Sequence, residues 1–225
     1  MSGGGGHGGI ANGGGRGGYS HASTGNFWKL NAREVSWGAV CPYPHAPPAS
    51  RDPYETTKEP MECWAIDITK EYLKFSAAHF LIFPDGSTER LHGHNYRVSL
   101  ELQGGLDGHG LVLDFIQVKP VIRTICDGLD EHLLLPGKHP ELKVKQRDDG
   151  VTEVRYRDQF YAAPSGDVIV LPINNTSSEN LSTWIGRLLH ERLTERFPGV
   201  RIDALMVAVE ETSGQRGIYR YSRGD

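Results

Sequence analysis

The stretch "LHGHNYRVSLEL", residues 91–102, predicts a β-strand that begins with two histidines. Side chains alternate between the two faces of a strand, and here the apolar ones all fall on one face. That face carries His92, His94, Tyr96, Val98, Leu100 and Leu102. The two imidazoles therefore extend the row of side chains that faces the core.

The preceding segment "CWAIDITKEYLKFSAAHF", residues 63–80, predicts a second long strand. The core-facing residues Ile66 and Ile68 are at even positions, whereas Phe75, Ala77 and His79 are at odd positions. The alternation therefore changes near residues 70–73. A β-bulge produces such a change. The polar loop "PDGSTER", residues 84–90, joins the two strands into a hairpin, which brings His79 alongside the two other histidines.

Three imidazoles around an open fourth position are typical of a catalytic zinc site. The alternative is that each histidine is a hydrogen-bonded core or rim residue. Unpaired polar groups in a core cost about 1–3 kcal/mol each, and one metal ion would satisfy all three. The sequence therefore predicts Zn²⁺ bound by His79, His92 and His94.

Two helices and one further long strand follow. Apolar residues recur at helical spacing in residues 116–129 and 181–197, Asp114 is an N-cap residue, and Thr176 with Glu179 fits a capping box. Residues 201–212 alternate as a strand, and residues 141–160 form a charged hairpin around Asp149-Gly150. This order predicts an α+β fold, an antiparallel sheet with two helices on one face and the hairpin inserted as a solvated projection.

Composition bounds the remaining possibilities. Residues 1–60 are rich in glycine and proline and are predicted to be disordered, which leaves residues 61–225 as one domain. The net charge of -4 and the lack of a basic cluster argue against a nucleic-acid partner. Three cysteines without CxxC spacing, no hydrophobic leader and no long apolar run predict a cytoplasmic protein without a membrane role.

Several motifs together resemble the 6-pyruvoyltetrahydropterin synthase family, which includes the 6-carboxytetrahydropterin synthases. They are "FSAAHF", "LHGHNYRV", "LVLDF", "TSSENLSTWI" and "VEETSGQRGIYR", in family order across residues 64–221. The resemblance implies a zinc-dependent lyase with a small-molecule pterin substrate. It also implies the tunnelling fold, in which the sheets of a homo-oligomer form a barrel, trimers stack into a hexamer, and sites lie between subunits.

The resemblance also implies roles for individual residues. The zinc ligands would be His79, His92 and His94. Glu211 would bind the pterin ring, although the pattern alone favours a solvent-exposed strand end. The pterin pocket would be lined by Ser177, Ser178 and Glu179. Glu179 is equally explained by its capping position.

One departure from the family concerns the catalytic base. Family members that make pyruvoyl or carboxy pterins carry a cysteine a few residues before the HxH motif, but "PDGSTERLHGH", residues 84–94, contains none. A subgroup has glutamate in an ExxHGH pattern, which Glu89 matches. That subgroup is associated with cleavage of 7,8-dihydroneopterin triphosphate to 6-hydroxymethyl-dihydropterin, a folate precursor. Glu89 is therefore the candidate base, unless it is a solvated loop residue paired with Arg90.

A second departure concerns the proton relay, for which the family typically reads "LDH". This chain has Leu129-Asp130-Glu131-His132, so either Asp130 and His132 form a relay shifted by one residue or the relay is altered. The predicted function is that of a zinc-dependent lyase in pterin biosynthesis that acts on 7,8-dihydroneopterin triphosphate, with 6-hydroxymethyl-dihydropterin as the first candidate product. The alternatives are 6-pyruvoyltetrahydropterin or 6-carboxytetrahydropterin synthesis, or a catalytically altered member that binds zinc and pterin.

Overall fold

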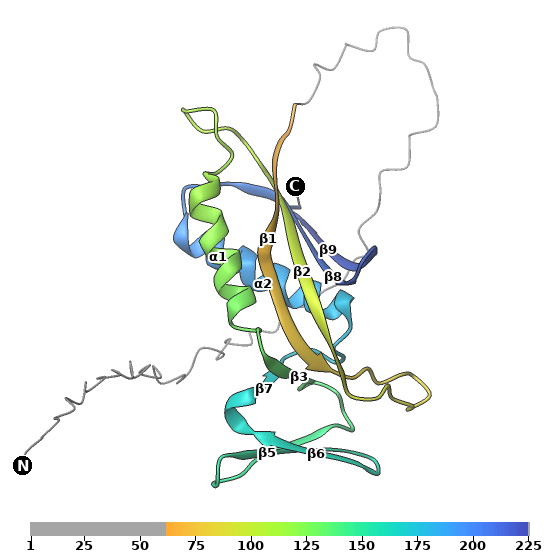
Figure 1. The fold of residues 1–225 in the computed structure, drawn as a ribbon. Helices are drawn as coiled ribbons and strands as arrows, with labels where there is room; N and C mark the ends of the chain where they lie inside the picture. Colours follow the sequence, from red (N-terminus) through yellow and green to blue (C-terminus); the bar gives the residue numbers. More distant parts are fainter. Residues whose placement is uncertain (1–61, 225) are drawn as a thin grey trace, which may run out of the picture. The chain divides into compact units, whose positions relative to one another are not determined.

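A computed structural model describes residues 62–224, so residues 1–60, predicted to be disordered, lie outside the described residues. The helices are α1 (Phe115–Asp127) and α2 (Ser178–Arg196) (Figure 1). The strands are β1 (Trp64–His79), β2 (His92–Gly104), β3 (His132–Pro136), β4 (Lys143–Gln146), β5 (Val151–Tyr156), β6 (Gln159–Pro164), β7 (Val168–Leu171), β8 (Ile202–Thr212) and β9 (Gln215–Ser222). Among the described residues, no helix has both the length and the apolar character needed to span a bilayer.

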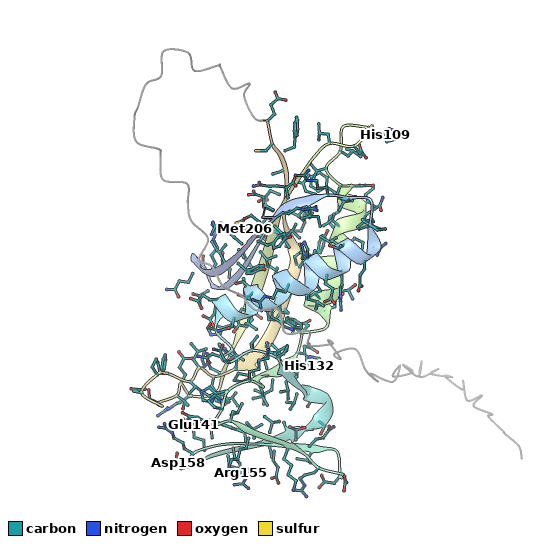
Figure 2. All side chains as sticks on the ribbon, turned by 180° about the vertical axis from the view of Figure 1, so that it is seen from behind. His109, His132, Glu141, Arg155, Asp158 and Met206 are labelled. Atoms are coloured by element: carbon teal, nitrogen blue, oxygen red, sulfur yellow. The ribbon has the colours of Figure 1, made fainter. Side chains whose placement is uncertain are left out.

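Six strands form the main sheet in the order β7-β3-β1-β2-β8-β9. Both helices lie on the same face of this sheet, as Figures 1 and 2 show from opposite sides. The predicted α+β class with two helices on one face is confirmed. The sheet is mixed rather than wholly antiparallel, because β3 pairs in parallel with both β1 and β7.

The predicted change of alternation in β1 is present as a register shift. The pairing of β1 with β2 shifts between Thr69 and Lys74. Ile68 before the shift and Phe75 after it are both only 1% exposed, so both halves of the strand direct apolar side chains into the core. The second half then continues to His79, which pairs directly with His92.

The ends of the helices follow simple capping rules, with one correction. The Asp114 carboxylate accepts a hydrogen bond from the Ile116 amide at 2.8 Å, which confirms it as the N-cap of α1. The N-cap of α2 is Ser177, so the predicted capping box starting at Thr176 is wrong. Thr176 is fully buried and its hydroxyl donates to the Phe80 carbonyl at 3.0 Å, which leaves the next residue to cap the helix.

The inserted segment is a small sheet of its own, in the order β4-β5-β6. The hairpin predicted around Asp149-Gly150 is β4 and β5, and β6 adds a third strand. One face is not solvated as predicted, because Val154 and Tyr156 are 1% and 2% exposed. They pack with Phe80, Ile82 and Leu135 in a second hydrophobic cluster, so the insertion is joined to the segment that follows β1.

Gly217 of β9 lies against the first turn of α2 and supports a first prediction. A Cβ atom at this position would be 2.3 Å from the Ser178 carbonyl carbon and 2.4 Å from the Glu179 amide nitrogen. Because backbone atoms cannot move aside as a flexible side chain can, Gly217→Ala is expected to lower the free energy of unfolding by about 1–3 kcal/mol. Urea unfolding at a fixed protein concentration measures the change.

Gly105→Ala is the matched control, since a Cβ atom there meets nothing within 4 Å. Its free energy of unfolding is expected to stay within about 0.5 kcal/mol of the unaltered protein. Equal destabilisation by the two substitutions would contradict the proposed close approach.

Candidate metal-binding site

The structure brings His79, His92 and His94 together at one end of the β1–β2 hairpin. One ligand atom from each imidazole lies within 4.8 Å of the other two. The ring centroids of His79 and His92 are 4.7 Å apart, and that of His94 is 5.2 Å from His79 and 4.7 Å from His92. The i, i+2 spacing on β2 and the direct pairing of His79 with His92 produce this convergence.

Backbone carbonyls orient two of the three imidazoles. His79 Nδ1 lies 3.0 Å from the Thr176 carbonyl oxygen, and His92 Nδ1 lies 2.7 Å from that of Arg90. A carbonyl can only accept, so each Nδ1 carries the proton and each Nε2 offers a lone pair. This is the arrangement by which outer hydrogen bonds fix a histidine ligand for a metal ion.

Burial keeps His79 neutral. Its side chain is fully buried, and desolvation lowers its pKa by more than the nearby Glu211 carboxylate raises it. A neutral imidazole is the protonation state that binds a metal ion. Three imidazole nitrogens without a cysteine among them fit Zn²⁺ with a fourth position left for a water or a substrate oxygen.

Two carboxylates flank the histidines. Glu211 Oε1 lies 3.2 Å from His79 Nε2 and 3.5 Å from His94 Nε2. Glu89 Oε2 lies 3.8 Å from His92 Nε2. The side chains of Glu211 and Glu89 are 23% and 35% exposed, so each reaches both the cluster and solvent. Proton-accepting oxygens thus stand beside the candidate metal position.

Tyr96 also belongs to this cluster, although the sequence did not single it out for a role. Its side chain is fully buried, and its hydroxyl lies 3.1 Å from His79 Nε2 and donates to Glu211 Oε1 at 3.2 Å. Burial, followed by the charge of Glu211, raises the pKa of Tyr96, so the hydroxyl keeps its proton and remains a donor. The sequence signal for this role is the position of Tyr96 two residues after His94, which places both side chains on the same face of β2.

The segment predicted to line a pterin pocket begins next to the cluster. The carbonyl that orients His79 belongs to Thr176, and the next three residues are Ser177, Ser178 and Glu179. Ser177 Oγ accepts from the Asn180 amide as the helix cap, whereas the Glu179 side chain is exposed. Their role in substrate binding stays a prediction.

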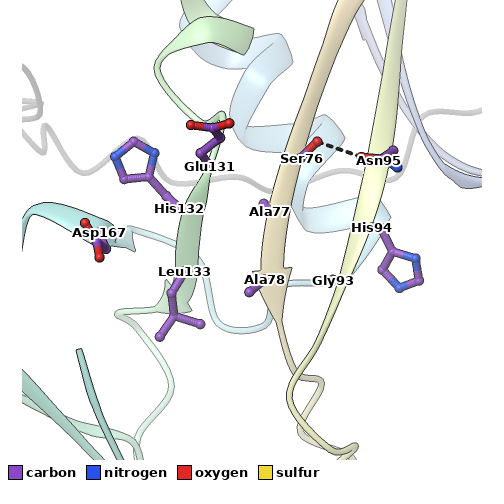
Figure 3. Close-up of a pocket in the computed structure, with 10 residues that line it drawn as sticks. All are labelled: Ser76, Ala77, Ala78, Gly93, His94, Asn95, Glu131, His132, Leu133 and Asp167. Carbon is purple, nitrogen blue, oxygen red and sulfur yellow. Dashed lines mark hydrogen bonds between the residues drawn. The ribbon is translucent and has the colours of Figure 1, made fainter. Parts of the chain in front are cut away.

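The predicted relay residues lie at or just before the start of β3, and β1 separates this strand from β2, which carries His92 and His94. Asp130 Oδ1 accepts from the Ser76 amide at 2.6 Å, and His132 Nδ1 lies 2.5 Å from the Asp130 carbonyl oxygen. His132 and His94 both line a cavity of about 400 Å³, and Figure 3 shows their side chains directed away from each other with β1 between them. Among residues 62–224, no hydrogen bond or ion pair connects Asp130 or His132 to the histidine cluster, so the relay stays a prediction.

Between Asp130 and His132, the backbone adopts a left-handed conformation. Glu131 has a φ of 60°, and its amide donates to the Ser76 carbonyl at 2.7 Å. The left-handed conformation at this residue begins the parallel pairing of β3 with β1, in which His132 stands opposite Ala77. Glu131 is also among the residues that line the 400 Å³ cavity.

Comparison with known proteins gives a consistent result. Residues 67–222 match the family model for 6-pyruvoyl tetrahydropterin synthase. A Methanocaldococcus jannaschii protein provisionally named 6-carboxy-5,6,7,8-tetrahydropterin synthase is 34% identical over 149 residues, which are 66% of this chain and 90% of that protein. The crystal structure of Plasmodium vivax 6-pyruvoyltetrahydropterin synthase is 29% identical with a TM-score of 0.68, covering 72% of this chain and 100% of that one.

Two further structures of the Plasmodium vivax protein carry a substitution of a catalytic residue. In one, a glutamate is replaced by alanine, and in the other the same glutamate is replaced by cysteine. Each is 28% identical to this chain with a TM-score of 0.68, and each covers 72% of this chain and 100% of its own.

Proposed function

The chain belongs to the 6-pyruvoyl tetrahydropterin synthase family, and from this premise we propose that it is a zinc-dependent lyase acting on 7,8-dihydroneopterin triphosphate. The observation that carries the proposal is the convergence of His79, His92 and His94. In His79 and His92 a backbone carbonyl binds Nδ1, which leaves the lone pair of Nε2 available to a metal ion. Glu89 and Glu211 beside this cluster supply the groups that a proton-transfer reaction needs.

The first candidate for the product is 6-carboxytetrahydropterin. Curated relatives from Methanocaldococcus jannaschii, Pyrococcus abyssi and Halobacterium salinarum, 27–34% identical to this chain, carry the name of the 6-carboxy synthase. These names favour the 6-carboxy reaction, which the sequence supported only as an alternative, over release of 6-hydroxymethyl-dihydropterin.

The identity of the candidate base, Glu89, favours a second candidate product, 6-hydroxymethyl-dihydropterin. Neither thiol of the described chain can replace the missing cysteine. Cys126 is buried within α1, where burial raises its pKa to about 12, and Cys63 precedes β1 at the end of the hairpin opposite His79. Glu89 instead approaches the cluster, and in the Plasmodium vivax relative a glutamate is the catalytic residue that was substituted.

The residues of the site suggest how the reaction proceeds. When bound, Zn²⁺ supplies a Lewis acid beside the hydroxyl groups of the substrate side chain. Glu211, held by the Tyr96 hydroxyl, accepts hydrogen bonds from the pterin ring. Glu89 takes the proton from a side-chain hydroxyl. In the cleavage reaction that oxygen becomes a carbonyl, the neighbouring carbon–carbon bond breaks, and the electron pair enters the ring before a proton restores a C–H bond.

We also infer that the protein is a homo-oligomer built from trimers, and that it acts in the cytoplasm. The helices cover one face of the sheet, and the end strands β7 and β9 each pair with only one neighbour in the described chain. Such edges suit pairing between subunits. Sedimentation equilibrium would give the mass of the assembly, and a monomer at micromolar concentration would contradict the inference.

Product identification tests the proposed function. The purified, zinc-loaded protein is incubated with 7,8-dihydroneopterin triphosphate, and the pterin products are identified by mass. A 6-carboxy product is expected if the curated names carry over, and a 6-hydroxymethyl product if Glu89 starts a cleavage. Zinc binding without turnover would contradict the enzyme and favour a member of the family that only binds zinc and pterin.

A further inference from the structure

The loop that carries Glu89 is held by the inserted sheet. The Tyr156 hydroxyl donates to the Gly86 carbonyl at 3.1 Å, and Gln159 Nε2 donates to Thr88 Oγ1 at 2.6 Å. These two bonds join the ends of β5 and β6 to the turn between β1 and β2. Figure 2 labels Glu141, Arg155 and Asp158 at the end of the molecule that this insertion forms.

We infer that the β5–β6 hairpin positions the proposed base, with Tyr156 and Gln159 as positioning residues for Glu89. This inference rests on the function proposed for Glu89. It gives the insertion a role in the reaction, although the hairpin supplies no group that reaches the histidines.

The contacts lead directly from the hairpin to the base. Thr88 forms an isolated bridge with Ile82, and the next residue, Glu89, donates its amide proton to the Leu81 carbonyl at 3.0 Å. The bond from Gln159 therefore acts one residue before the base, and the bond from Tyr156 acts three residues before it. The backbone of Glu89 is then fixed on both sides of its side chain, because His92 begins β2 three residues later.

Packing shows that the hairpin approaches the turn closely. Gly86 has a φ of 81°, and a Cβ atom there would be 1.9 Å from Nη2 of Arg157. Arg157 is the first residue of the turn between β5 and β6. Its Nε atom forms an ion pair with Glu141 Oε2 at 3.2 Å. Beneath these polar contacts, Tyr156 and Val154 pack against Phe80 and Ile82, so the loop is attached through an apolar cluster as well.

The proposed reaction is sensitive to small displacements of the Glu89 carboxylate. Its carboxylate lies 3.8 Å from His92 Nε2, and both side chains are more than a third exposed, so neither is fixed by its own burial. A displacement of about 1 Å in a reacting group can cost about 10²-fold in rate. Hydrogen bonds from a packed element are the usual means of preventing such displacement.

The test removes the two hydrogen bonds and keeps the shape of the residues. In the zinc-loaded full chain, the double variant Tyr156→Phe, Gln159→Leu is expected to lower kcat about 10-fold, to leave KM within about twofold and to retain its zinc. Tyr161→Phe is the matched control. Tyr161 belongs to the same hairpin and packs on Phe80 with ring centroids 5.5 Å apart, and its hydroxyl forms no hydrogen bond within the described chain.

Two further measurements separate positioning of the base from a general loss of structure. In a Glu89→Gln background the double variant is expected to cause no additional loss of kcat, because the group that it misplaces is already inactive. An equal loss in both backgrounds would overturn the inference. Amide hydrogen exchange is expected to accelerate in residues 83–91 and to stay unchanged in residues 96–102.

The exchange measurement also distinguishes this inference from the proposed function. Faster exchange with unchanged kcat, or unchanged exchange with any change in kcat, would overturn the positioning role. If the unaltered protein does not turn over 7,8-dihydroneopterin triphosphate, the proposed function fails, and exchange in residues 83–91 alone then decides whether the hairpin holds the loop.

Discussion

Glu89→Gln is expected to lower kcat by about 10²- to 10⁴-fold, the usual contribution of a general base. Glutamine has nearly the same shape as glutamate and can keep the place of the side chain beside His92, but its amide cannot accept a proton from the substrate. Zinc content is expected to stay unchanged, since Glu89 is not one of the three converging ligands. Steady-state kinetics together with metal analysis measure both quantities.

Glu101→Gln is a suitable control for this substitution. Glu101 also belongs to the hairpin, on β2, but it pairs with Asp67 and Met206 away from the cluster, so its loss is expected to leave kcat within about twofold. If Glu89→Gln kept full activity, Glu89 would not be the base, even if the enzyme class were right. If it lost zinc along with activity, Glu89 would be acting on the metal instead.

Removal of one histidine is expected to have the second large effect. The free energy of zinc binding in protein sites, about 10–16 kcal/mol over four ligands, corresponds to roughly 3 kcal/mol for each ligand. His92→Ala is therefore expected to weaken zinc binding by about 10²- to 10³-fold and to abolish turnover at micromolar zinc. Titration with a competing chelator measures the affinity.

His92 is preferred to His79 for this experiment because its side chain is 38% exposed, so alanine leaves no buried cavity. His79→Ala would also leave the Thr176 carbonyl without its partner in a buried position, which would lower stability. His109→Ala, in an exposed loop, is the control and is expected to leave zinc affinity unchanged. Retention of full zinc affinity by His92→Ala would contradict the three-histidine site.

The parts that were predictable from the sequence depend on alternation and helical spacing. The change of parity between Ile68 and Phe75 predicted the register shift, and the shift together with the hairpin predicted that His79 meets His92 and His94. Both helices and strand β8 followed from apolar periodicity. These features are local, so a single sequence contains the information that determines them.

The features that were missed depend on contacts between distant segments. Strands β3 and β7 are short, with five and four residues, and their apolar residues follow one another without alternation. They are strands because β3 pairs in parallel with β1 and β7 pairs in parallel with β3. The alternation of β2 predicts that Tyr96 faces the core, but its place in the site depends on Glu211, which is 115 residues away in the chain. The charge of the insertion concealed its inner face, where Val154 and Tyr156 pack against the loop of Glu89.

The register shift between Thr69 and Lys74 makes the site sensitive to the number of residues in β1 as well as to their identity. The shift moves the core-facing side chains from even-numbered to odd-numbered positions of the strand. With one residue fewer in this segment, Ile68 and the other core residues could keep their places only if His79 turned to the helix-free face. The number of residues between Thr69 and Lys74 is therefore constrained by His79, a candidate ligand further along the same strand.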